Sequence, residues 1–145
     1  MRTTRGLAEK ALEAVVNRYV VLYLATLIVL IPIDFLFLGV VAKGFFTSEV
    51  GDMLGEIRPL PAMLFYLLYV AGILIFVSGS VSATWQTTLL YGALFGFFAY
   101  ATYDLTNFAT LKVWTLRVTM LDMAWGTVLT GATSTAGALA ALKFK

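Results

Sequence analysis

The chain has 145 residues, of which 61% are hydrophobic and 12% are charged, and its formal net charge is +2. A soluble domain is about 45–50% apolar and about 25% charged, so we predict an integral membrane protein. Because the sequence contains no Cys and no His, it excludes disulfides, thiolate metal sites and a histidine general base. It also contains no basic run, so nothing in it indicates a nucleic-acid partner.

The first predicted element is an amphipathic leader helix over residues 4–18. Leu7, Leu12 and Val15 belong to an apolar set at helical spacing. Two interpretations stay open, a helix on the inner membrane surface and a helix that docks a partner protein. A signal peptide is not expected, because the apolar run that follows exceeds an h-region of about 7–15 residues.

Four segments are long and apolar enough for membrane spans, namely residues 20–41, 61–77, 88–109 and 118–142. A helix needs about 20 such residues to cross a hydrocarbon core of about 30 Å, and backbone that faces lipid must be helical. The connections are short, which favours antiparallel neighbours. We therefore predict one all-α membrane domain over residues 1–145, an antiparallel up-down bundle of four transmembrane helices with the N-terminal leader helix.

The distribution of basic residues predicts the orientation of this multi-pass protein. With a cytoplasmic N-terminus, six Lys and Arg residues lie on the inner side and four on the outer side, which favours cytoplasmic placement of both termini. The inner residues are Arg2, Arg5, Lys10, Arg18, Lys143 and Lys145, and the outer residues are Lys43, Arg58, Lys112 and Arg117.

The first outer connection contains apolar residues at helical spacing. Val50, Met53, Leu54 and Ile57 would share one face, and Ser48 is a candidate N-cap. This pattern predicts a short helix lying flat on the outer surface. It could be an ordinary interfacial connection or a lid over a site.

Three aspartates lie within the predicted spans, where an acid at a helix centre costs about 2.5–3.5 kcal/mol on insertion scales. From a rise of about 1.5 Å per residue, Asp34, Asp104 and Asp122 lie about 13, 12 and 7 Å from the outer ends of their helices. All three therefore fall in the outer half of the bilayer. We expect them to point into the bundle and to cluster within about 10 Å.

Polar neighbours could satisfy these acids. Tyr100, Tyr103 and Asn107 lie within one turn of Asp104, and Pro32 frees a backbone carbonyl near Asp34. We predict a ligand-binding site with Asp104 at its centre and with no metal assigned to it. Its residues are Asp34, Tyr100, Tyr103, Asp104, Asn107, Arg117, Asp122 and Trp125. The structural alternative is a set of interhelical hydrogen bonds with an Arg117 ion pair.

Small residues recur in the last two spans. Gly92 and Gly96 form a GxxxG pair, and Thr127, Gly131 and Thr135 form a stripe. Close packing within one chain or a homodimer face would each explain this pattern.

Several stretches resemble one known family. "GALFGFFAYATYDLTNFATLKVW" and "LDMAWGTVL", supported by "IDFLFLG" and "FYLLYVAG", closely resemble the small bacterial membrane proteins of the domain-of-unknown-function 2177 family. The resemblance covers roughly Tyr19 to Leu142, with Phe37 where we expect the family to prefer Trp. It implies a four-helix protein of the bacterial inner (plasma) membrane with no established activity, often encoded near lipid-modification and oxidative-stress genes.

Three function classes follow. In the first, an outward-side carboxylate cluster binds a cation, a proton, or a polar lipid or small ligand. The second is an accessory or scaffold subunit of a larger membrane complex. The third is a lipid-modifying intramembrane enzyme that uses carboxylates, Tyr, or Mg²⁺ or Mn²⁺ held by Asp34, Asp104 and Asn107. The outward position of the acids disfavours an enzyme that takes nucleotide-activated donors from the cytoplasm.

Overall fold

The computed structural model describes residues 2–144, with side chains from Arg5 to Phe144. Every element in this part of the chain is helical, and the side chains of Arg2 and Lys145, which we counted for orientation, lie outside it. The elements are α1 (Arg2–Leu36), the π-helical segment η1 (Phe37–Val41), α2 (Lys43–Val50), the 3₁₀ turn η2 (Gly51–Met53), α3 (Pro59–Ile73), the π-helical segment η3 (Leu74–Ser78), α4 (Trp85–Thr110), α5 (Leu116–Ala140) and the 3₁₀ turn η4 (Leu142–Phe144).

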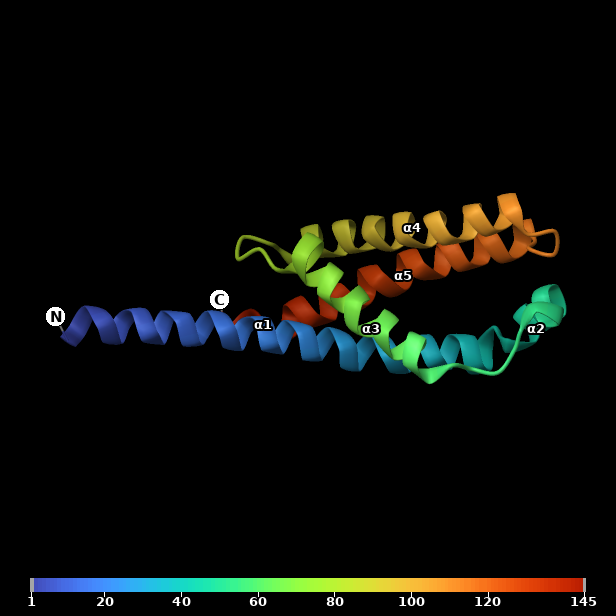
Figure 1. Cartoon of the computed structure of the whole chain (residues 1–145). Helices are drawn as coiled ribbons and strands as arrows, with labels where there is room; N and C mark the ends of the chain where they lie inside the picture. The colour runs from blue at the N-terminus through green and yellow to red at the C-terminus, as the bar shows by residue number, and fades with distance from the viewer. Residues whose placement is uncertain (1, 145) are drawn as a thin grey trace.

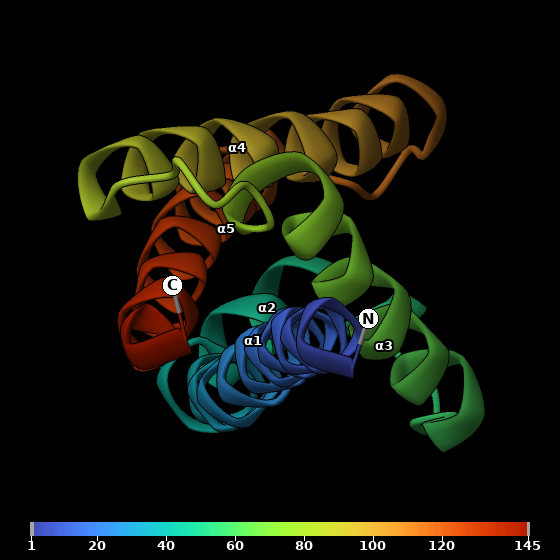
Figure 2. The ribbon, with the colours of Figure 1, turned by 90° about the vertical axis from the view of Figure 1, so that its left-hand side faces the viewer.

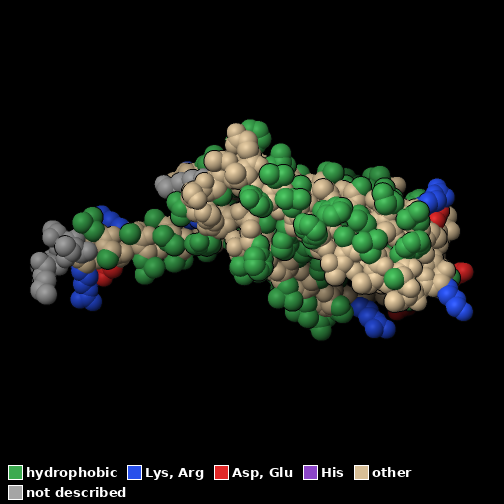
Figure 3. All heavy atoms as spheres, turned by 90° about the horizontal axis from the view of Figure 1, so that it is seen from above, with side chains coloured by type: hydrophobic (Ala, Val, Ile, Leu, Met, Phe, Trp, Pro, Cys, Tyr) green, Lys and Arg blue, Asp and Glu red, His purple; other side chains and the backbone are tan. Residues whose placement is uncertain are grey.

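Two stretches of the described chain are long and apolar enough to cross a membrane. They are Arg5–Val41, which combines most of α1 with η1, and Pro59–Ser78, which combines α3 with η3. Figure 3 shows charged side chains at the two ends of the molecule and apolar side chains over the middle of the face in view.

The leader and the first predicted span form one uninterrupted helix. α1 contains 35 residues, which corresponds to about 52 Å of length, and its N-terminal part extends beyond the other helices (Figure 1). The apolar side chains of Leu7, Leu12, Val15 and Val16 are exposed there. The structure thus differs from a leader lying flat on the membrane, because that orientation requires a bend before the span.

Short polar side chains fix where α4 and α5 begin. Thr84 and Thr87 form a reciprocal capping box at the start of α4, and the Thr115 hydroxyl accepts a hydrogen bond from the backbone N–H of Val118 at the start of α5. α3 begins at Pro59, whose missing N–H costs nothing in the first helical turn.

The helices α4 and α5 lie side by side along most of their length (Figures 1 and 2). A Cβ at Gly96 would collide with the carbonyl oxygen of Gly126, and one at Gly92 would collide with the hydroxyl of Ser134. The GxxxG pair therefore packs against α5 of the same chain, as the first of our two interpretations expects.

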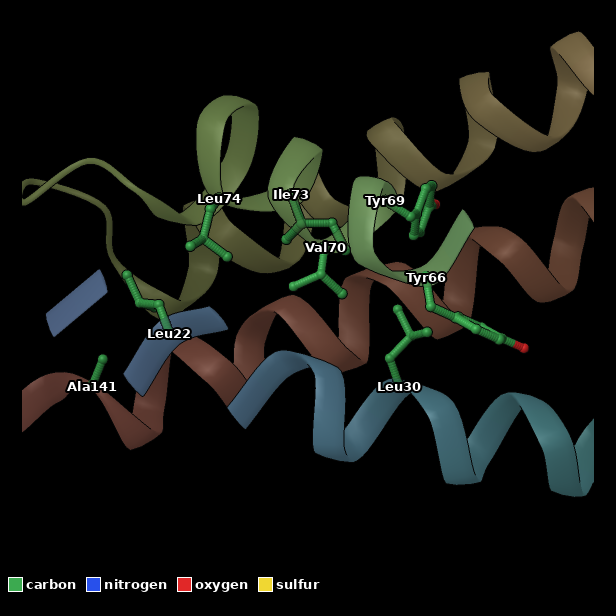
Figure 4. Packing of buried hydrophobic residues seen from close by; sticks show 8 residues of the cluster. All are labelled: Leu22, Leu30, Tyr66, Tyr69, Val70, Ile73, Leu74 and Ala141. Atoms are coloured by element: carbon green, nitrogen blue, oxygen red, sulfur yellow. The ribbon is translucent and has the colours of Figure 1, made fainter. Parts of the chain in front are cut away.

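The buried hydrophobic cluster lies between α1, α3 and the end of α5 (Figure 4). Its members are Leu22, Leu30, Tyr66, Tyr69, Val70, Ile73, Leu74 and Ala141. The Tyr66 ring leaves this cluster with its hydroxyl pointing away from the aliphatic side chains (Figure 4). The cluster thus holds α3 in place and presents a phenol group beyond the core.

The connection between the first two predicted spans differs from its prediction. The helix α2 ends at Val50, where the predicted helix would begin, and Gly51–Met53 form a 3₁₀ turn. Gly51 and Gly55 weaken helix formation by about 1 kcal/mol each, and the chain leaves the helix at the first of them. Ser48 donates a hydrogen bond to the Phe45 carbonyl oxygen, so it is not an N-cap.

A buried arginine holds the turn that follows η3. Arg18 is 3% exposed, and its guanidinium donates to the carbonyl oxygens of Ser78 (3.4 Å), Gly79 (2.8 Å) and Ser80 (2.9 Å). A planar fork of donors suits several carbonyls at a helix end. Arg18 therefore has a structural role beyond the orientation signal that we assigned to it.

Candidate functional site

A cavity of about 500 Å³ lies between the end of α1, η1, α2, α3, α4 and the start of α5. Seven of its 14 lining residues are aromatic and two are aspartates. The lining consists of Asp34, Leu38, Phe46, Val50, Leu54, Ala62, Phe65, Tyr66, Tyr69, Ala99, Tyr100, Tyr103, Trp114 and Asp122. This volume is typical of small-molecule sites, which occupy about 300–1,000 Å³.

Asp34 joins three helices through its carboxylate. Tyr66 of α3 donates a hydrogen bond to Oδ2 (2.8 Å), and the indole N–H of Trp125 of α5 donates to Oδ1 (2.9 Å). The Trp125 ring also stacks on Phe37, with 3.7 Å between ring centroids and an interplanar angle of 8°. Both oxygens of Asp34 are therefore already used as acceptors.

Asp122 lines the same cavity, but unlike Asp34 it accepts no hydrogen bond from the described residues. Asp122 is 9% exposed, and no hydrogen bond joins its carboxylate to another residue in the described part of the chain. The Asp122 oxygens are not among the fully buried unpartnered atoms of the described residues, so they are open to the cavity that Asp122 lines. There the carboxylate can accept a hydrogen bond or pair with a positive charge.

Asp104 is buried completely but does not line the cavity. Neither of its oxygens has a hydrogen bond of ordinary geometry among residues 2–144, and the indole Nε1 of Trp114 also has none, but this indole N–H interacts with the Asp104 carboxylate. Trp114 lines the cavity and packs edge-on against Tyr103, with 5.6 Å between ring centroids. The structure thus places Asp104 outside the cavity lining, whereas we expected it at the centre.

The three acids come from three helices and lie close enough for their charges to interact. Asp122 interacts electrostatically with both Asp34 and Asp104. Of the other expected site residues, Tyr100 and Tyr103 line the cavity. Trp125 does not line the cavity but donates a hydrogen bond to Asp34, which does.

Two expected site residues lie elsewhere. Asn107 is half-buried and does not line the cavity itself, although its side chain interacts with Tyr103, which does. Arg117 donates to Glu49 Oε1 (2.6 Å) instead of to any of the three aspartates. Thr115 donates to Oε2 of the same glutamate (2.7 Å). The expected ion pair of Arg117 therefore fastens α2 to the start of α5.

The segment from α2 to Leu54, which this ion pair holds against the start of α5, forms part of the cavity wall. Phe46 and Val50 of α2 and Leu54 of the following loop belong to the lining. The structure thus places this segment against the candidate site, and Glu49 is the residue that holds it there.

Sequence reasoning missed Tyr66 and Tyr69, because we treated their span as uniformly apolar. Tyr69 shares a hydrogen bond with Thr130 (2.7 Å), and Tyr66 binds Asp34. A usable signal was present, since residues three apart share a helix face and a buried phenol usually finds a hydrogen-bond partner.

The described residues bring together no group of three or more His, Cys, Asp or Glu side chains that could hold a metal ion. The chemistry that the site offers is therefore a free carboxylate in an aromatic cavity. Such a group can accept hydrogen bonds or pair with a positive charge.

Comparison with known proteins gives a family and no close relative. No curated protein and no solved structure matches the chain. The model of the family described as "Predicted membrane protein (DUF2177)" matches residues 19–139, which confirms the resemblance in the central and C-terminal motifs. With most of its length inside that match, the chain belongs to the DUF2177 family of predicted membrane proteins.

Proposed function

We propose that the chain crosses the bacterial inner membrane four times, through α1, α3, α4 and α5, as an antiparallel up-down bundle with both termini in the cytoplasm. The positions of the helix ends support this arrangement. Both termini and the turn before α4 lie at one end of the molecule, and α2 and the turn before α5 lie at the other (Figure 1). The cavity then belongs to the outer half of the bilayer.

Single cysteines test this topology, because the chain has no native cysteine. A thiol reagent that does not cross membranes should label Asp52→Cys and Lys112→Cys in intact cells. Ser82→Cys should react only after the membrane is opened. Labelling of Ser82→Cys from outside would reverse the orientation and move the cavity to the cytoplasmic half.

We further propose that the protein binds a small ligand in this cavity, with its carboxylates as the recognition groups. One observation carries the proposal: Asp122 is 9% exposed, has no hydrogen-bond partner among the described residues and opens onto a cavity of about 500 Å³. Ionisable groups inside a membrane are costly and typically functional. A ligand with a complementary group would supply the missing partner.

A cavity-filling substitution tests binding without a guess at the ligand. Ala99 lines the cavity, and Ala99→Phe should fill part of it. Ala109→Phe, at an exposed position of the same helix, is the matched control. Protein purified in a mild maltoside detergent should carry a bound small molecule that mass spectrometry detects in the wild type and in the control, and that is missing in Ala99→Phe.

Two results would contradict ligand binding. One is the absence of any bound molecule from the wild type. The other is an unchanged amount of bound molecule in a correctly folded Ala99→Phe variant. A lipid profile of a deletion strain separates the enzymatic alternative, since loss of a lipid-modifying enzyme changes the lipids themselves, whereas loss of a binding protein or a subunit leaves their chemistry intact.

A further inference from the structure

We infer that the cavity takes a lipophilic organic cation, a protonated amine or a quaternary ammonium group on an apolar body. This inference rests on the proposed ligand-binding function and names the class of ligand. Three features of the described residues carry it: the charge balance of the cavity, the aromatic character of its walls and the small number of oxygen ligands.

The charge balance of the cavity is negative. Asp34 and Asp122 line it, and no Lys or Arg does. Arg117, at the start of α5, is engaged by Glu49 and lies over the Phe45 ring. Asp34 receives two neutral donors, so Asp122 is the group left to pair with a positive charge.

The walls provide surfaces that attract cations. Four tyrosines and Trp114 contribute to the lining, and the faces of such rings attract ammonium groups, Trp most strongly. The rings meet at steep angles, 74° between Tyr69 and Tyr100 and 90° between Tyr103 and Trp114. Rings in several orientations can surround a rounded cation, and they also cover the apolar body of a ligand.

The other ligand classes fit this cavity less well. Ca²⁺ and Mg²⁺ take six or more oxygen ligands, and the described part of the chain assembles no such group of acids. An anion would meet two carboxylates without a basic residue in the lining. A neutral hydrocarbon would leave Asp122 buried and unpaired, which the desolvation cost of a carboxylate disfavours.

Shape-matched probes test the inference. Benzyltrimethylammonium, its uncharged carbon isostere neopentylbenzene and the anion phenylmethanesulfonate would each be titrated into the full-length protein in maltoside micelles, with tryptophan fluorescence as the readout. The cation should bind at least about tenfold tighter than the isostere, because a hydrogen bond or ion pair to a charged group is worth about 1.5–3 kcal/mol. Asp122→Asn should remove this preference, and Asp52→Asn, the same change at an exposed site, should preserve it.

A fourth probe identifies the source of the cation. Dihexanoyl phosphatidylethanolamine carries its ammonium group on a lipid head group. Tighter binding of this lipid than of benzyltrimethylammonium points to a lipid, and the reverse points to a free amphiphilic amine. Either result supports recognition of an ammonium group.

The comparison of cation and isostere in the wild type stands even if Asp122→Asn fails to fold. Equal affinities of the cation and the isostere, with both lost in Ala99→Phe, would overturn cation recognition and leave a ligand-binding cavity. Preferential binding of phenylmethanesulfonate would overturn it in the same way. Failure of every probe to bind would also overturn the inference, and the mass-spectrometric comparison with Ala99→Phe would then decide the proposed function separately.

Discussion

Substitution of Asp34 by Leu should weaken the attachment of α1 to both α3 and α5. Asp34 is 3% exposed, and its carboxylate accepts hydrogen bonds from Tyr66 and Trp125. Leu is of similar size but accepts neither bond, so a phenol and an indole N–H would be buried without partners. Tyr66→Phe removes only one of the two bonds, and the exposed Tyr91 provides a control with the same change of side chain.

The expected loss follows from the two bonds. Hydrogen bonds between transmembrane helices average about 0.6 kcal/mol and reach about 1.7 kcal/mol, so Asp34→Leu should lower the free energy of unfolding by about 1–3 kcal/mol. Tyr66→Phe should cost about half as much, and Tyr91→Phe almost nothing. In the double variant, Tyr66→Phe should cost nothing further, because the phenol has already lost its acceptor.

The measurement is reversible unfolding by sodium dodecyl sulfate in mixed micelles, followed by far-ultraviolet circular dichroism. The four proteins of the cycle give the coupling energy between Asp34 and Tyr66 directly. Strictly additive effects of the two substitutions would refute a direct bond between these residues. Unchanged stability of Asp34→Leu would refute the three-helix junction as a whole.

Three other substitutions give further tests, all measured by the same unfolding assay. Asp104→Leu should change stability by less than about 1 kcal/mol, because neither Asp104 oxygen has a hydrogen bond of ordinary geometry and the carboxylate interacts only weakly with the Trp114 indole N–H; a larger loss would indicate a bound partner. Arg18→Lys should cost about 1–3 kcal/mol, since one ammonium group cannot replace a fork that reaches several carbonyls; equal stability would show that the fork is dispensable. Gly96→Ala should cost about 1–3 kcal/mol, because the added Cβ would collide with α5. Gly44→Ala, whose Cβ meets open space, should be neutral or stabilising by up to about 1 kcal/mol. Similar results for both substitutions would argue against the close packing of α4 on α5.

The convergence of Asp34 and Asp122 could be predicted from the sequence, because the rise of a helix is fixed and the helix ends are marked by polar residues; their depth in the bilayer stays a prediction. Counting along three helices places Asp34 and Asp122 at the same end of the molecule, and both line one cavity. The hydrogen-bond and ion-pair partners of the polar residues could not be predicted in this way. The partner of Arg117 is 68 residues away, in α2, and its position depends on how the first connection folds.

The first connection shows why local pattern alone was insufficient. Its apolar spacing predicted a helix through Ile57, but two glycines within the run favour termination, and the helix ends at Val50. The hydrophobic residues are still used, since Val50 and Leu54 line the cavity. Val50 reaches the cavity from the last residue of α2 and Leu54 from the extended segment after the 3₁₀ turn, so the two do not share one helix face.

The close packing of α4 on α5 has a consequence for biosynthesis. Among the described residues, only α1 and α3, each with its π-helical extension, pass as membrane spans on length and hydropathy, and α4 and α5 each carry a buried aspartate. In the proposed four-span topology, either acid would meet lipid if its helix entered the bilayer alone, at a cost of up to about 2.5–3.5 kcal/mol at a helix centre and less toward the helix ends. Two helices joined by a short turn and matched through glycines can leave the translocon as a preassembled hairpin, with Asp104 and Asp122 shielded from lipid before either helix meets it. We therefore expect α5 to integrate poorly when it is synthesised without α4.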